Sequence, residues 1–69
     1  MSIIEVTVNG EQQSIPPGQT ILQLLKALAI TPDRVAVELD RAIVRKAQWS
    51  STEIQPGAHL EIVHFVGGG

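Results

Sequence analysis

The sequence predicts an α+β domain in which a mixed sheet of about five strands packs on one helix. Three observations support this fold class. Apolar and polar side chains alternate with a period of two in residues 3–8 and again in 35–40, as in half-buried strands. Apolar residues between 21 and 28 instead recur at helical spacing. A final run at 58–66 predicts one more strand.

The first 18 residues predict a hairpin. Asn9-Gly10 follows the first strand directly, and both central positions of a type I′ turn require a positive φ, which these two residues tolerate. A short second strand over 12–15 should pair with the first. Pro16-Pro17-Gly18 would then end the pairing, because proline has no backbone N–H to donate.

The single helix is expected to begin at a capping box. Thr20 is the N-cap, and Gln23 is placed to bond back to the Thr20 N–H. Four apolar residues at i, i+3, i+4 and i+7 share one helical face: Ile21, Leu24, Leu25 and Leu28. We expect the helix to end near Ile30, since Pro32 disfavours the helical conformation of the residue before it.

The second half of the chain predicts a return to the sheet. After the strand at 35–40, a tight turn at Asp40-Arg41 leads into a short strand around Ile43-Val44. Lys46-Ala47-Gln48 can form one helical turn. Gln55-Pro56-Gly57 then suits a type II turn before the last strand.

Two strands, a helical crossover and the returning strands allow the last strand to lie parallel to the first, with the helix on one face. This is the β-grasp arrangement. We expect the domain to cover residues 1–66 and a flexible glycine tail to cover 67–69. The expected core residues are Ile4, Val6, Ile15, Ile21, Leu24, Leu25, Leu28, Val35, Val37, Leu39, Leu60 and Ile62.

Composition excludes several classes of protein. The chain has 69 residues, 43% hydrophobic and 17% charged, which is typical of one folded domain. It lacks cysteine, so neither disulfides nor a cysteine-ligated zinc are expected. The net charge of −2 gives no electrostatic basis for binding nucleic acid. Because no stretch suits a membrane span or a signal peptide, we expect no membrane partner and a cytoplasmic location.

Catalytic residues and metal ligands are not expected within the domain. His59 and His64 are five residues apart on one expected strand, so they point to opposite faces, and no third ligand has a suitable spacing. The seven carboxylates are scattered singly, and no nucleophile has an adjacent base. Arg41, Arg45 and Lys46 form a basic cluster that is either a solvated loop or a contact for an acidic partner surface.

The chemically informative feature is the C-terminal triplet Gly67-Gly68-Gly69. Glycine has no Cβ and visits every backbone region, so such a tail can enter a narrow channel and present its carboxylate to another protein. A carboxylate becomes electrophilic only when its oxygen is converted to a leaving group, which implies adenylation with ATP. The alternative interpretation is a frayed or artificial terminus.

Half of the chain resembles a known family. The segments at 37–44, at 48–49, at 55–57 and at 61–69, with the Val-Gly-Gly-Gly ending, are similar to the ubiquitin-like sulfur carriers of the ThiS/MoaD family. The resemblance is closer to the thiamin-biosynthesis branch than to the molybdopterin carriers, which are usually longer and end in an apolar residue, Ala or Ser, and Gly-Gly. Arg45-Lys46 departs from the Pro-Arg pair that is common in these carriers.

The resemblance implies that the chain is a protein co-substrate rather than an enzyme. A ThiF-type adenylating enzyme would use ATP to convert the carboxylate of Gly69 to an adenylate. Sulfur from a cysteine desulfurase or a rhodanese would then replace AMP, leaving a 1-thioglycine thiocarboxylate. Gly67 and Gly68 would give access, and a ThiG-type thiazole synthase would take up the sulfur. The carrier itself would bind no cofactor.

Other functions remain open at this point. The sulfur acceptor could be molybdopterin or another compound. A protein modifier conjugated to lysines through Gly69 would share the same activation chemistry. A plain interaction module with an incidental tail would undergo no activation.

The alternation of the last strand predicts an exposed apolar pair. If Leu60 and Ile62 face the helix, then Val63 and Phe65 point to the opposite face of the sheet, where both are exposed to solvent. We expect these two residues, with Val66, to dock the carrier on its partners. The alternative is that Phe65 folds back onto the sheet edge and shields itself.

Overall fold

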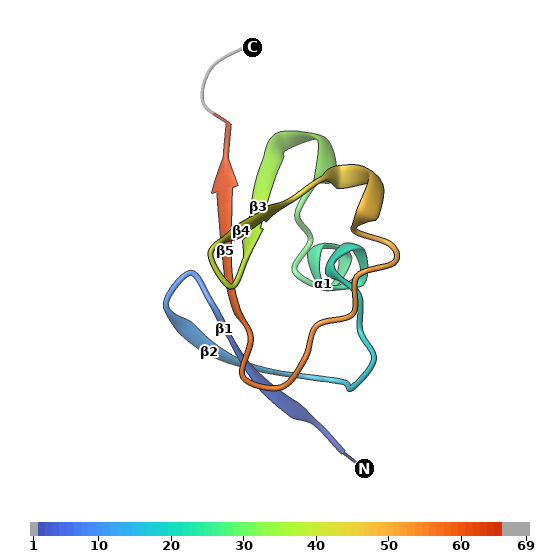
Figure 1. Cartoon of the computed structure of the whole chain (residues 1–69), viewed down its shortest axis with the longest axis vertical. Coiled ribbons are helices and arrows are strands. Elements are labelled where there is room, and N and C mark those ends of the chain that lie inside the picture. The colour runs from blue at the N-terminus through green and yellow to red at the C-terminus, as the bar shows by residue number, and fades with distance from the viewer. Residues whose placement is uncertain (1, 66–69) are drawn as a thin grey trace.

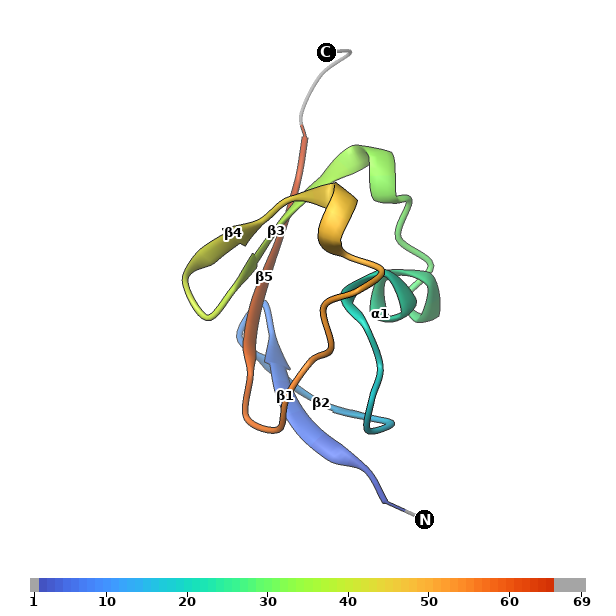
Figure 2. The same ribbon diagram turned by 45° about the vertical axis from the view of Figure 1, so that its right-hand side comes forward.

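One mixed sheet and one helix make up the computed structural model of the chain, which describes residues 2–65 (Figure 1). The strands have the order β2-β1-β5-β3-β4, and α1 lies against one face of the sheet (Figures 1 and 2). The elements are β1 (Ile4–Val8), β2 (Glu11–Ile15), α1 (Ile21–Ala27), β3 (Val35–Leu39), β4 (Ala42–Val44) and β5 (His59–His64), with 3₁₀ turns η1 (Pro32–Arg34) and η2 (Lys46–Gln48). The α+β, β-grasp prediction is therefore confirmed.

The register places β5 in the middle of the sheet. β1 and β2 form the predicted antiparallel hairpin, from Ile4 opposite Ile15 to Val8 opposite Glu11. β5 runs parallel to β1, with Val8 opposite Leu60, and antiparallel to β3. The parallel pairing of the first and last strands follows from the helical crossover between them.

Three turns lie where the sequence predicts them. Asn9 and Gly10 both have a positive φ, at 50° and 83°, as a type I′ turn requires. Asp40 and Arg41 repeat the pattern, with φ of 50° and 73°. Gly57 has φ of 80°, which suits the third position of the predicted type II turn.

The helix starts as predicted but ends earlier. The Thr20 hydroxyl accepts from the Gln23 N–H at 3.2 Å, and the Gln23 side chain accepts from the Thr20 N–H at 2.9 Å, so the capping box is present. The helix stops at Ala27 instead of near Ile30. Leu28 is consequently its C-cap and is 36% exposed, so the prediction of Leu28 as a core residue is wrong.

The early stop has a backbone cause. Ala29 adopts the left-handed conformation, with φ of 59°. Its N–H donates to the carbonyl of Lys26 at 3.0 Å, and the N–H of Ile30 donates to the carbonyl of Leu25 at 2.9 Å. These are the two hydrogen bonds of a Schellman motif, in which glycine usually occupies the position of Ala29.

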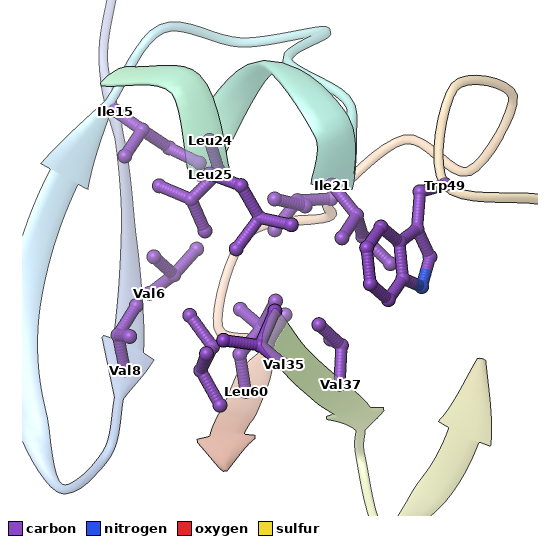
Figure 3. Close-up of a cluster of buried hydrophobic side chains, with 13 residues drawn as sticks. Val6, Val8, Ile15, Ile21, Leu24, Leu25, Val35, Val37, Trp49 and Leu60 are labelled. Atoms are coloured by element: carbon purple, nitrogen blue, oxygen red, sulfur yellow. The ribbon is translucent and has the colours of Figure 1, made fainter. Parts of the chain in front are cut away.

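The core lies between α1 and the sheet. Figure 3 shows side chains of the helix meeting those of β1, β3 and β5. The buried residues are Val6, Val8, Ile15, Ile21, Leu24, Leu25, Val35, Val37, Trp49, Ile54, Ala58, Leu60 and Ile62. Two expected core residues, Ile4 and Leu39, are only partly buried.

The segment between η2 and β5 contributes three core residues that the sequence did not predict: Trp49, Ile54 and Ala58. The Trp49 ring lies beside Ile21 at one end of the cluster (Figure 3), and its indole N–H donates to the carbonyl of Val44 at 2.8 Å. The same segment caps the helix, because the N–H groups of Ile21 and Leu22 donate to the carbonyls of Thr52 and Trp49, each at 3.1 Å.

The Asn9 side chain extends the pairing of β1 with β5. Its Oδ1 accepts from the Ile62 N–H at 2.7 Å, and its Nδ2 donates to the Ile62 carbonyl at 3.2 Å. The backbone N–H of Asn9 donates to the Leu60 carbonyl at 2.9 Å. After Asn9 the chain turns away into β2, so the amide side chain takes the place of one more residue of strand.

Replacing Asn9 with glycine tests this bridge. Glycine tolerates the positive φ but cannot bond to Ile62, so Asn9→Gly should lower the free energy of unfolding by about 1–3 kcal/mol. Urea denaturation followed by the fluorescence of the buried Trp49 measures the change. Asn9→Asp keeps the acceptor for the Ile62 N–H and should lose less. A glycine variant as stable as the parent would show that the bridge contributes nothing.

Replacing Ala29 with glycine tests the end of the helix. Glycine adopts the left-handed conformation without strain, so Ala29→Gly should raise the free energy of unfolding by about 0.5–1 kcal/mol. Ala27→Gly, two residues earlier and inside the helix, should lower it by a similar amount of about 0.5–1 kcal/mol. Thermal melting of both variants checks the pair, and a loss of stability in both would contradict the assigned geometry.

Candidate functional site

The candidate site is the end of β5 and the tail that follows it. The predicted reactive residue Gly69, with Gly67, Gly68 and Val66, lies outside the described residues. The last described residue, Phe65, is held next to the start of β3, because its N–H donates to the carbonyl of Arg34, the last residue of η1, at 2.9 Å. Since β5 pairs with β1 on one side and β3 on the other, the tail leaves the domain from a central strand.

The side chains of β5 alternate between the core and solvent. Leu60 and Ile62 are buried against the helix. Val63 and Phe65 are 55% and 60% exposed, on the side of the sheet that α1 does not cover. The expected exposure of both residues is therefore confirmed, and the alternative in which Phe65 shields itself does not hold.

The helix-free side of the sheet, here called the outer face, is apolar near the end of β5 and acidic farther from it. Val63 lies opposite Ala36 in the register of β5 with β3. The next pair of residues whose side chains point to the outer face is Glu61 opposite Glu38. Glu38 also lies opposite Ile43 on β4. Like charges directly opposite each other on neighbouring strands are destabilising. The fold therefore retains an arrangement that stability alone does not favour.

Ile43 was not predicted to be part of this surface. It is 75% exposed and is an apolar residue of the outer face. The signal was present in the sequence, because the alternation of 35–39 places Glu38 outward and a tight turn sets Ile43 opposite it.

A shallow hollow at the far end of the outer face is lined by polar side chains. Its residues are Glu38, Asp40, Arg41, His59 and Glu61. The Asp40 carboxylate accepts from the backbone N–H of His59 at 2.9 Å, so it holds the turn after β3 to the start of β5. Within residues 2–65 no group of three or more His, Cys, Asp or Glu residues could hold a metal ion.

The basic residues of the second half lie on both sides of one strand. Arg41 comes directly before β4 and Arg45 directly after it. Lys46 is paired with Asp33 of η1. A docking role for these residues stays a prediction.

No helix in the described part of the chain is long and apolar enough to cross a membrane.

Comparison with known proteins identifies the family. The model of the ThiS family matches residues 6–69. The chain is 35% identical over 66 residues to a thiazole synthase of Magnetococcus marinus and to one of Paramagnetospirillum magneticum, which covers 96% of the chain in each case. The chain spans only 20% of the length of these two relatives. It is also 32% identical over 68 residues to protein ycf40 of Pyropia yezoensis, covering 99% of the chain and 96% of that relative.

Solved structures have the same architecture. The crystal structure of the thiamine biosynthesis protein (ThiS) from Geobacter metallireducens superposes with a TM-score of 0.83 at 28% identity, covering 96% of this chain and 100% of that one. The solution structure of a thiamine biosynthesis protein from the same organism gives a TM-score of 0.75 at 28% identity, covering 96% and 88%. Because the family model spans nearly the whole sequence and the fold agrees, this chain belongs to the ThiS family.

Proposed function

We propose that the chain is a sulfur carrier of thiamin biosynthesis whose C-terminal Gly69 is adenylated and converted to a thiocarboxylate. The observation that carries this proposal is the match to the ThiS family, which continues through the terminal glycines to residue 69. The relatives named thiazole synthase support thiazole formation as the step that receives the sulfur.

The chemistry takes place on the main chain. An oxygen of the Gly69 carboxylate attacks the α-phosphate of ATP in the adenylating enzyme, and pyrophosphate leaves. The outer sulfur of a cysteine persulfide on a cysteine desulfurase or a rhodanese then displaces AMP from the acyl group, forming an acyl disulfide. A second thiol cleaves this disulfide, which releases the thiocarboxylate and leaves the donor cysteine in a disulfide with that thiol. The sequence has no cysteine, so the carboxyl carbon of Gly69 is where this chain would hold the sulfur. ATP belongs to the activating enzyme, and the carrier itself needs no bound cofactor.

The domain serves this chemistry by presenting the tail. The central position of β5 and the hydrogen bond from the Phe65 N–H fix where the tail begins. Gly67 and Gly68 have no side chains, so they let the carboxylate enter a narrow active site. The adenylating enzyme and thiazole synthase would each receive the same tail in turn.

Changing the tail tests the proposed reaction. Deleting Gly69, or adding one residue after it, should abolish sulfur loading, since the carboxylate no longer reaches the reacting atoms. Mass spectrometry after incubation with ATP, the adenylating enzyme and sulfide would detect replacement of one oxygen by sulfur in the parent alone. An extra residue before Met1 is the matched control and should leave loading intact. Full loading of the C-terminally extended chain would refute the proposal.

Docking on these enzymes would use Val63, Phe65 and Val66. Val63 and Phe65 are exposed apolar side chains next to the tail, and soluble proteins rarely leave such side chains grouped in water without a partner. Val63 lies on the central strand β5, and Phe65 directly after it is hydrogen-bonded to Arg34, so the positions of both relative to the start of the tail are fixed.

Truncating Phe65 tests the docking role. Phe65→Ala should weaken binding to the adenylating enzyme and to thiazole synthase by about 1–3 kcal/mol, as the loss of an interface anchor does. The melting temperature should change little, because Phe65 is 60% exposed. Ile3→Ala is the matched control: Ile3 is equally exposed, at 60%, but precedes β1 at the other end of the molecule. Unchanged binding with a large loss of stability would make Phe65 a structural residue instead.

A further inference from the structure

The backbone of β5 has one open position just before the tail. Its antiparallel pairing with β3 alternates, as such ladders do, between pairs that exchange hydrogen bonds and pairs that do not. The Asp40 N–H donates to the His59 carbonyl at 2.7 Å, and the Phe65 N–H donates to the Arg34 carbonyl at 2.9 Å. Counting from these two bonds, the odd-numbered residues of β5 face β3. The even-numbered residues Leu60, Ile62 and His64 direct their N–H and C=O groups toward the side of β1.

β1 fills only part of that side. The Leu60 carbonyl accepts a hydrogen bond from the backbone N–H of Asn9. The N–H and the C=O of Ile62 are both hydrogen-bonded to the Asn9 side chain. The hairpin then turns back, and β5 continues past its tip (Figures 1 and 2). Among residues 2–65, no group is hydrogen-bonded to the N–H or C=O of His64 on this side.

We propose that this open position is a strand-addition site: an extended segment of thiazole synthase forms backbone hydrogen bonds with the N–H and C=O of His64 on β5. A free N–H and C=O on one side of a strand residue are the groups that an added strand uses. This inference rests on the proposed function, because it takes the partner from there.

One observation favours thiazole synthase over a second copy of this chain. In the two bacterial relatives, a segment similar to this chain is part of a protein named thiazole synthase, so the two lie in one polypeptide there. Neighbouring Val63 and Phe65 lie on the outer face, so they can contact the same partner without blocking the edge.

Two substitutions at His64 distinguish the contribution of its backbone N–H to binding from that of its imidazole side chain. His64→Pro removes the N–H, and proline is tolerated where an edge N–H has no partner within the sheet. His64→Ala removes the same imidazole but keeps the N–H. Calorimetric titration of thiazole synthase with unmodified carrier should give affinities within about twofold of the parent for His64→Ala. For His64→Pro, affinity should fall by about tenfold or more, the scale of one lost hydrogen bond.

Amide exchange of the parent protein provides a second measurement, which holds even if the proline variant does not fold. The His64 N–H should exchange rapidly in the free carrier and at least about tenfold more slowly in the complex. Equal affinity of the two variants, or rapid exchange in the complex, would overturn the inference. Protection that rises with carrier concentration alone would assign the edge to a second copy and would also overturn it.

These outcomes are independent of sulfur loading. Binding is measured with the unmodified carboxylate, so failure to load sulfur would refute the proposed reaction without affecting the titration. Conversely, normal loading together with equal binding of both His64 variants would refute strand addition alone.

Discussion

The pairing of β5 between β1 and β3 is the interaction on which the rest of this small structure depends. It joins the first strand of the chain to the last, and it buries Leu60 and Ile62 under the helix. The parallel side of this pairing is short, with two residue pairs in register, and the Asn9 side chain lengthens it. Asn9 therefore forms part of a tight turn through its backbone, and its side chain links two strands that are far apart in the sequence.

The two faces of the sheet have different roles because there is only one helix to cover them. α1 has seven residues and covers one face, where most of the buried side chains gather. The outer face is left with an unbalanced mixture: an apolar end at Val63 and Phe65, and two carboxylates opposite each other at Glu38 and Glu61. A surface that is neither uniformly polar nor electrostatically optimal is better explained by binding than by folding.

Much of this fold could be predicted from the sequence because its local signals agree with one another. The type I′ turn at Asn9-Gly10, the tight turn at Asp40-Arg41, the capping box and the alternation of β1, β3 and β5 each depend on neighbouring residues. Each appears where expected. The burial of Trp49 and Ile54 could not be predicted, since the segment between η2 and β5 has no period and is held by contacts with the start of the helix. The end of the helix was misplaced because Ala29 occupies a position where glycine is the usual signal.

In the candidate site, too, features that depend on neighbouring residues could be predicted and features that depend on distant contacts could not. Exposure of Val63 and Phe65 could be predicted from a period of two, whereas the role of Gly69 stays a prediction from composition and resemblance. The open position at His64 could not, because it depends on where a distant hairpin turns and on how far the Asn9 side chain reaches. Such features are properties of the assembled sheet and leave no local pattern in the sequence.

The parallel arrangement of β1 and β5 also determines how the domain responds to force. A partner that grips the C-terminal end while the N-terminal end is held pulls two neighbouring strands along their axes in opposite directions. The hydrogen bonds from the Thr7 N–H to Ala58, from the Asn9 N–H to Leu60, and from the Ile62 N–H to Asn9 are then sheared together instead of opening one at a time. The C-terminal strand is thus held by hydrogen bonds loaded in shear, which must break together. The lifetime of the domain under force is then set by the rate at which this whole group of bonds breaks.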